Sequence, residues 1–209
     1  MDKKHPFFSV IVPEHNSADF MRKGLDSIKS QTFTDYELIV VCDGEKEAKI
    51  AKEYTDAVYL IDGQLCSQKR NHGLDMATGT WILFMDDDDW FMDSMVFQTI
   101  ADAVGKEDED ILAFGFYWNG HGAHMNKPDH LYTAVWNKCW RREFVERIGA
   151  RFPDWEHSDD DGFSRRTHHK ARKIAYLNQC LYFYNFLREG SLTWKMENGM
   201  MDKSIPKEV

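Results

Sequence analysis

Long apolar runs are missing from this 209-residue sequence. No stretch approaches the roughly 18 consecutive apolar residues that a membrane-spanning helix requires. The longest apolar run near the beginning covers residues 7–12 and stops at Pro13, so it is too short for the core of a secretory signal peptide. We therefore expect no transmembrane segment and a cytoplasmic protein.

Closely spaced cysteines are also absent. The four cysteines, Cys42, Cys66, Cys139 and Cys180, stand far apart, and none belongs to a Cys-x-x-Cys motif. Structural zinc sites and redox-active dithiols usually carry such pairs. The spacing therefore favours reduced, mostly buried thiols over disulfides or a zinc site.

Several common motifs of nucleotide enzymes and hydrolases do not occur. The sequence has no G-x-x-x-x-G-K-[ST], G-x-G-x-x-G or G-x-S-x-G segment, which argues against a P-loop nucleotidase, a dinucleotide-binding enzyme and an α/β-hydrolase. Positive charge is scarce too, because 26 Lys and Arg stand against 35 Asp and Glu, a net charge of −9. Such a chain is a poor candidate for binding nucleic acid through its phosphates, whereas acids gathered at one site would suit a metal cation.

Strand-like and helix-like patterns alternate in the first half of the chain. Apolar runs typical of buried strands cover residues 7–12, 36–42, 57–61 and 80–85, with expected helices at 20–28, 45–54 and 67–76. This alternation predicts right-handed crossovers and a parallel sheet. Ligands of such sheets bind beyond the carboxyl ends of the strands, so we expect Asp43 and the acidic run 86–89 to share one crevice.

The second half is more mixed. We expect helices over 92–104, 141–148 and 159–170, strands over 111–118 and 181–186, an extended segment over 131–136, and a solvated, mobile tail from 197. We expect most tryptophans here to lie in the core, although an aromatic side chain at a cleft can stack on a sugar or a base. The length suits a single domain.

The strongest functional signal is the run of four aspartates at 86–89, directly after an expected buried strand. Adjacent carboxylates repel one another unless a cation or wide exposure to solvent relieves them. Alternate positions can converge on Mg²⁺ or Mn²⁺, which keeps positions open for substrate phosphates. A solvated acidic loop is the other interpretation, but the place at the carboxyl edge of the sheet favours a metal site.

Two further polar segments allow both a structural and a functional interpretation. Asp159, Asp160 and Asp161 open an expected helix, where acids stabilise the helix dipole, yet one of them could act as a general base if it faced the metal crevice. Lys69 and Arg70 open another expected helix and suit a diphosphate, although they could equally form a solvated helix face.

These segments, in this order, resemble the family 2 glycosyltransferases, which have the GT-A fold. The motifs that carry the resemblance lie at residues 8–16, 27–33, 36–44, 69–73, 84–89, 136–142, 159–166 and 184–192. Glu14 and His15 stand where the family usually has Thr and Tyr, and Cys42 replaces the first acid after the second strand. The resemblance covers residues 7–193, nearly the whole chain.

The resemblance implies an α/β fold with a Rossmann-like, mostly parallel central sheet, helices on both faces and a smaller mixed C-terminal region on the acceptor side. It divides the single domain 1–209 into a nucleotide-sugar-binding half, 1–90, a half for the acceptor and catalytic base, 91–196, and the tail 197–209.

The resemblance also implies roles for individual residues. Asp160 matches the catalytic base of the family, and Asp86 and Asp88 match the acids of its D-x-D motif as metal ligands, with Asp88 the direct one. The residues implied to hold the nucleotide sugar are Pro13, Glu14, Asn16, Asp43, Lys69, Arg70, Asp86, Asp87 and Arg188.

The implied activity is the inverting transfer of a sugar from a nucleotide-diphosphate sugar, UDP-linked, to an acceptor hydroxyl, with Mn²⁺ or Mg²⁺ as cofactor. The acceptor stays open among a glycan, a lipid-linked sugar, a protein side chain and a modified nucleobase. One alternative is a metal-dependent sugar-phosphate nucleotidyltransferase, which usually needs a basic, Gly-rich loop that the segment after Val12 does not provide. Another is a non-catalytic binding module of the same fold, which the departures at Glu14, His15 and Cys42 keep open.

Overall fold

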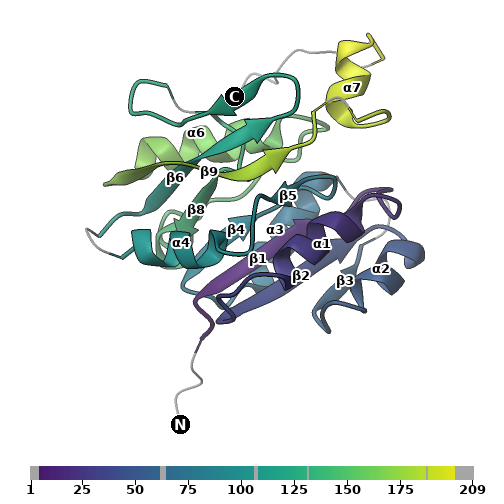
Figure 1. The fold of residues 1–209 in the computed structure, drawn as a ribbon, viewed down its shortest axis with the longest axis horizontal. Helices are drawn as coiled ribbons and strands as arrows, with labels where there is room; N and C mark the ends of the chain where they lie inside the picture. The colour runs from purple at the N-terminus through teal and green to yellow at the C-terminus, as the bar shows by residue number, and fades with distance from the viewer. Residues whose placement is uncertain (1–4, 62–64, 106–107, 131, 187, 201–209) are drawn as a thin grey trace.

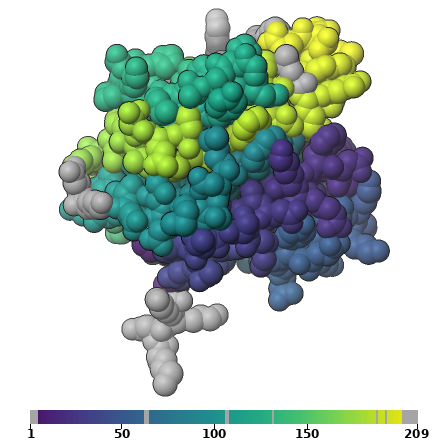
Figure 2. All heavy atoms as spheres, in the orientation of Figure 1, coloured from purple at the N-terminus to yellow at the C-terminus, as the bar shows by residue number. Residues whose placement is uncertain are grey.

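The structure, a computed structural model, describes residues 5–61, 65–105, 108–130, 132–186 and 188–200. Its strands form one curled sheet in the order β3-β2-β1-β4-β8-β6-β9-β5, with β7 paired to β6 (Figure 1). In the space-filling view, the green and yellow C-terminal segments lie on the purple and blue N-terminal segments (Figure 2). The α/β fold expected from the sequence is confirmed.

The N-terminal half supplies the parallel part of the sheet. Strands β3 (Val58–Leu60), β2 (Tyr36–Cys42), β1 (Phe8–Pro13) and β4 (Trp81–Phe84) pair in parallel. The crossovers contain the helices α1 (Met21–Lys29), α2 (Glu45–Ala51) and α3 (Cys66–Met76). Both β1 and β4 are buried along their whole length, which is why their sequences are continuous apolar runs instead of alternating patterns.

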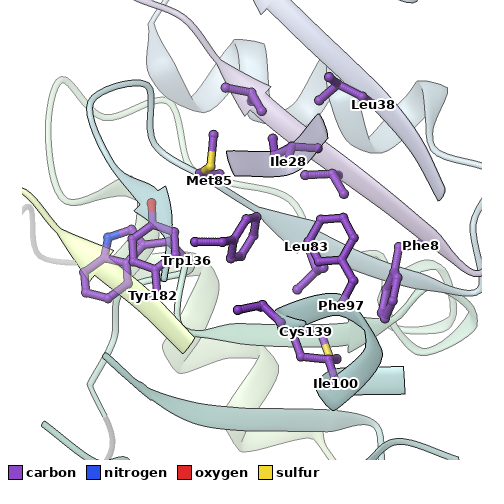
Figure 3. Close-up of a cluster of buried hydrophobic side chains, with 14 of the residues drawn as sticks. Phe8, Ile28, Leu38, Leu83, Met85, Phe97, Ile100, Trp136, Cys139 and Tyr182 are labelled. Carbon is purple, nitrogen blue, oxygen red and sulfur yellow. The ribbon is translucent and has the colours of Figure 1, made fainter. Parts of the chain in front are cut away.

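Helices cover both faces of this sheet. Val10 and Val12 of β1 belong to a core shared with α1, α2 and α4 (Val96–Ala103), part of which is drawn in Figure 3. Ile11, between them, belongs to a second core shared with α3, α5 (Arg142–Arg147) and α6 (Asp159–Lys170). Because side chains alternate along a strand, a single strand supplies both cores.

Helix α3 packs closely on β1 at Gly73. A Cβ atom at this position would lie 2.3 Å from Cγ2 of Ile11, so only glycine permits the approach. The buried side chain of Lys69, one turn earlier, then donates to the backbone carbonyl of Glu14 at 2.9 Å, directly after β1. The N-terminal end of α3 is thereby tied to the carboxyl edge of the sheet.

The C-terminal half of the sheet is mixed, as the sequence predicted. Strand β8 (Lys138–Arg141) lies antiparallel between β4 and β6 (Ile111–Trp118), and β9 (Ile174–Tyr184) runs parallel to β6. Two short strands, β5 (Trp90–Phe91) and β7 (Gly122–His124), add antiparallel pairs. The short helix α7 (Leu192–Glu197) follows β9 and was not expected from the sequence.

In this half the structure has a strand that the sequence did not predict, β8, and the last strand begins earlier than expected. The described residues 132–136 form no strand; the strand forms over Lys138–Arg141 instead, and the buried Lys138 ammonium binds the carbonyls of Tyr132 and Ala134. Strand β9 begins at Ile174, well before 181, because it pairs with β6 while exposing polar side chains at 178 and 179. Of the tail from 197, residues 201–209 lie outside the described part of the chain.

Candidate active site

A cavity of about 550 Å³ opens beyond the carboxyl ends of β1 and β4. Segments far apart in the sequence line it, and several of the residues expected to form a site meet there. The expected residues that line the cavity are Pro13, Asn16, Arg70, Asp86, Asp87, Asp88, Asp160 and Arg188. The opening of parallel strands onto a ligand crevice is the usual arrangement in α/β sheets.

The four aspartates after β4 have different surroundings. Asp86, Asp87 and Asp88 line the cavity, whereas Asp89 is fully buried. The carboxylate of Asp89 accepts hydrogen bonds from the Tyr182 hydroxyl and the Asn185 backbone amide, each at 2.8 Å. It therefore fixes the end of β9 beside the acidic run and leaves the other three acids for the cavity.

Arg70 connects the two acidic segments of the site. Its buried guanidinium donates to Asp86 and to Asp159, at 2.7 Å in both cases. These two carboxylates lie 73 positions apart in the sequence, at the ends of β4 and the beginning of α6. An arginine held in this way fixes the distance between the run at 86–89 and the start of α6, and its charge is largely neutralised.

Asp43 lies beside the cavity and not in its lining. The ammonium of Lys69 donates to Asp43 at 2.8 Å, and the His15 ring nitrogen contacts the same carboxylate. The backbone amide of His15 also donates to Asp87 at 2.8 Å, so His15 joins the two crevice acids that the sequence analysis expected to meet. The pKa of Asp43 is lowered because the Lys69 and His15 interactions outweigh the opposing effect of burial.

Glu14 does not face the cavity. Its side chain is fully buried and accepts a hydrogen bond from Ser17. Burial, together with the nearby charge of Asp87, raises the pKa of Glu14 well above its ordinary value. Two positions further on, Asn16 lines the cavity with a left-handed backbone (φ 51°), and so does Ser158 (φ 59°). Non-glycine residues in this conformation are often found at functional sites.

Asp160 occupies the first turn of α6 and lines the same cavity as Asp86 and Asp88. Burial and the adjacent charge of Asp159 raise the pKa of Asp160 to about 7, against the opposing effect of Arg70. A carboxyl group with a pKa near neutrality can exchange a proton at the operating pH of most enzymes. The helix behind it is anchored by Phe163, which is buried and stacked on Phe152 with ring centroids 4.1 Å apart.

The cavity acids fit a divalent ion shared with a diphosphate. Burial raises the pKa of Asp87 to about 7, and burial likewise raises that of Asp88, so a cation here would relieve crowded carboxylates. Among the described residues, no group of three or more His, Cys, Asp and Glu side chains is arranged to enclose a metal. One or two carboxylates completed by phosphate oxygens and water is the mode in which Mg²⁺ is commonly bound, and Asp86 and Asp88 could supply them.

Several residues have a place in the site that the sequence did not assign to them. Asp159 and His15 orient other site residues, and the aromatic side chains of Tyr132, Trp136 and Tyr184 form part of the wall. Trp136 belongs to the core and lines the cavity at the same time. The sequence signals for this wall were the aromatic content of the C-terminal half, which core packing explains equally well, and the family segments 136–142 and 184–192, which contain Trp136 and Tyr184.

The profile of the family described as "Glycosyl transferase family 2" matches residues 9–175. The chain belongs to glycosyltransferase family 2. The resemblance found in the sequence is confirmed. One relative is the "Putative glycosyltransferase EpsH" of Bacillus subtilis, 29% identical over 86% of this chain and 60% of EpsH.

Solved structures of two glycosyltransferases share the fold. TarS 1–349 of S. aureus in complex with UDP-GlcNAc superposes with a TM-score of 0.79 at 22% identity, over 90% of this chain and 60% of that one. The mannosyltransferase PcManGT of Pyrobaculum calidifontis, in complex with GDP-Man and Mn²⁺, gives 0.71 at 16% identity, over 97% of this chain and 66% of that one. This family 2 chain thus spans about three fifths of EpsH and of TarS 1–349, two thirds of PcManGT and little more than a third of the longer TarS chain.

Within the described ranges, the family 2 chain has no helix with the length and apolar character needed to cross a bilayer.

Proposed function

We propose that this glycosyltransferase transfers a sugar, with inversion, from a UDP-sugar to an acceptor hydroxyl with the help of Mn²⁺ or Mg²⁺. The observation that carries the proposal is that Asp160 lines the same cavity as Asp86 and Asp88. A proton acceptor and a set of metal-binding acids are the two components that such a transfer needs on opposite sides of the anomeric carbon.

The donor end of the cavity is assigned to the purple and blue part of the chain in Figure 1. Pro13 and Asn16 at its rim, with Asp43 held by Lys69, are proposed to contact the nucleoside. The proposed contacts of the ribose and diphosphate are Asp86, Asp87, Arg70 and Arg188, while the buried Glu14 supports the loop after β1 from behind. The UDP and UDP-GlcNAc complexes of TarS support a UDP-linked donor.

Asp86 and Asp88 would hold the divalent ion, with Asp88 as the direct ligand. When bound, such an ion neutralises charge on the diphosphate and so makes it a better leaving group. The Mn²⁺ in the PcManGT complex supports this assignment. Arg188 is a second source of positive charge for the departing diphosphate, because its side chain already lies against Asp88.

Asp160 is proposed as the general base. It would take the proton of the acceptor hydroxyl while that oxygen attacks the anomeric carbon from the face opposite the diphosphate. One displacement of this kind inverts the anomeric configuration. Positioned proton transfer contributes roughly 10²–10⁴ to the rate. The pKa of Asp160, raised to about 7 by burial, suits this role because the carboxylate can both hold and release the proton near neutral pH.

The proposal is tested by incubating the protein with UDP- and GDP-sugars, Mn²⁺ and a set of saccharide acceptors, and identifying the released product. Free UDP that Asp160→Asn abolishes supports the proposed transfer, and NMR of the product establishes the anomeric configuration. Pyrophosphate in place of UDP would indicate a nucleotidyltransferase. If donor binding raises the melting temperature but no product forms with any donor and acceptor, the chain is a binding module.

A further inference from the structure

A row of aromatic side chains runs from the acidic run to the far wall of the cavity. Trp136 stacks on Tyr182 and on Tyr184, with ring centroids 4.8 and 5.0 Å away and interplanar angles of 9° and 28°. The ring centroid of Tyr184 in turn lies 5.9 Å from that of Trp118. Figure 3 shows the parallel packing of Trp136 and Tyr182. We call Tyr182, Trp136, Tyr184 and Trp118 the aromatic row.

The aromatic row begins at the acids assigned to the metal. The hydroxyl of Tyr182 accepts from the Asp86 backbone amide at 3.0 Å and donates to Asp89 at 2.8 Å. Phe116 meets Trp136 edge to face with centroids 4.7 Å apart, which holds the indole in place. The row is therefore held in place at the end nearest the acidic run 86–89, and it extends away from that run along β9 and β6.

The other end of the row lies at the cavity, where His121 and Phe186 pack on Trp118 with ring centroids 4.2 and 4.6 Å away. Trp118 and Tyr184 are only partly buried, and both line the cavity, as do Trp136 and the nearby Tyr132. The indole nitrogen of Trp118 is shielded from solvent and has no hydrogen-bond acceptor among the residues that the structure describes. A ligand in the cavity can therefore reach the ring of Trp118 but not its N–H group.

The charges around the cavity restrict what can lie on this row. The acids Asp87, Glu156 and Asp160 are part of the lining. Three lining cations, Arg70, Arg188 and Lys195, stand against six lining acids. The two arginines are already paired, Arg70 with Asp86 and Asp159, and Arg188 with Asp88. An acceptor that carries phosphates would meet net negative charge in the cavity, whereas a neutral ring with hydroxyl groups would not.

We propose that the acceptor is an uncharged sugar residue whose apolar ring face packs on Trp118 and Tyr184, with one hydroxyl directed toward Asp160. This inference rests on the proposed function and narrows it to a phosphate-free glycan. The C–H groups of a pyranose ring bury apolar area against an indole, and its hydroxyl groups suit the polar side chains of the same lining. The preference differs from the ribitol-phosphate polymer in the printed name of the relative TarS.

The test measures binding without turnover, by saturation-transfer NMR in the presence of UDP and Mn²⁺. The probes are the methyl glycosides of glucose, galactose and N-acetylglucosamine, with ribitol 5-phosphate and 9-methyladenine as the charged and the nucleobase alternatives. We expect saturation of the ring protons of at least one glycoside. Binding of ribitol 5-phosphate or 9-methyladenine in preference to every glycoside, or binding of no glycoside at all, overturns the inference.

Variants locate the binding to the row. Trp118→Ala should weaken glycoside binding about tenfold, which corresponds to about 1.4 kcal/mol, and Trp118→Phe should retain most of it. Tyr117→Ala is the matched control, because Tyr117 is the next residue on β6, exposed and not part of the cavity lining. Unchanged binding by Trp118→Ala contradicts the inference, while thermal unfolding verifies that each variant is folded. The release of UDP is scored separately, so a failed transfer assay and a failed acceptor assignment are told apart.

Discussion

The guanidinium Nε of Arg188 lies 2.6 Å from the carboxylate Oδ2 of Asp88. Both side chains are largely buried, and the two residues are separated by 100 positions in the sequence. The carboxylate proposed as the direct metal ligand is thus held by a cation of the chain itself. A divalent ion that binds the same oxygen of Asp88 has to displace the Arg188 guanidinium from it.

Replacement of Arg188 by Ala should change metal binding and catalysis in opposite directions. Without the competing guanidinium, Asp88 is free, so we expect Mn²⁺ to bind the donor-free protein several-fold more tightly, as titration calorimetry would measure. Transfer should fall about tenfold or more, because the departing diphosphate loses a positive charge. The control is Arg22→Ala, whose exposed ion pair with Glu53 lies outside the cavity. Weaker or unchanged Mn²⁺ binding by the Arg188 variant would refute the competition.

The rate of transfer should depend on the protonation of Asp160. Burial raises the pKa of this carboxyl to about 7, so the fraction able to accept a proton increases as the pH rises through neutrality. We expect kcat/KM to rise with pH up to about 7 and then level off. Asp160→Asn should lower kcat roughly 10²- to 10⁴-fold and remove this rise. A variant that keeps the pH profile of the parent would exclude Asp160 as the base.

The same carboxyl should reduce the stability of the fold above neutral pH. A pKa near 7 in the folded protein exceeds the ordinary value of 3.8, so the folded state binds more protons than the unfolded state between these values. Stability from this group is therefore fully present at low pH and is lost as the pH rises through about 7.

Asp160→Asn removes that dependence. We expect its melting temperature to exceed that of the parent by roughly 4–8 °C at pH 8, equivalent to about 2 kcal/mol, with little difference near pH 4. Scanning calorimetry at both pH values makes the comparison. A difference of equal size at pH 4 would show that the gain has another origin than the buried charge.

Lys138 should support the segment 132–137, which contributes Trp136 to the aromatic row. Its ammonium is fully buried and donates to the Ala134 carbonyl and the Asn137 side chain, at 2.6 Å in both cases, as well as to the Tyr132 carbonyl. Lys138→Met keeps the volume but leaves these oxygens without a donor, so we expect a loss of about 3 kcal/mol in urea unfolding. Lys52→Met, at an exposed helix end, should cost less than about 0.5 kcal/mol. Equal effects of the two variants would contradict this role.

Much of the scaffold could be read from local patterns. The continuous apolar runs that became β1, β2 and β4 reflect burial on both faces, which any parallel sheet between two helical layers imposes. The position of the acidic run followed from the same reasoning, because it comes directly after β4. Helix α6 was also predicted with its bounds, Asp159–Lys170, since its acidic start and basic end match the helix dipole.

Strand β8 could not be read in this way. Strands β4 and β6, which are distant in the sequence, decide which segment joins the sheet between them. They form hydrogen bonds on both sides with Lys138–Arg141 and not with residues 132–136. The inward turn of Glu14 is similar: a carboxylate after a strand would ordinarily face solvent, but Ser17 binds it inside the fold.

The sequence by itself determined the layers of the fold, the family and the acids at the edge of the sheet, because each depends on residues that are neighbours along the chain. Tertiary structure alone decided how those acids are used. Arg70 forms ion pairs with both Asp86 and Asp159, and Arg188 forms an ion pair with Asp88. The aromatic row consists of side chains from β6, β9 and the segment before β8 that pack on one another. Such contacts exist only after chain segments up to 100 positions apart have packed together, and no local periodicity encodes which side chains will then meet.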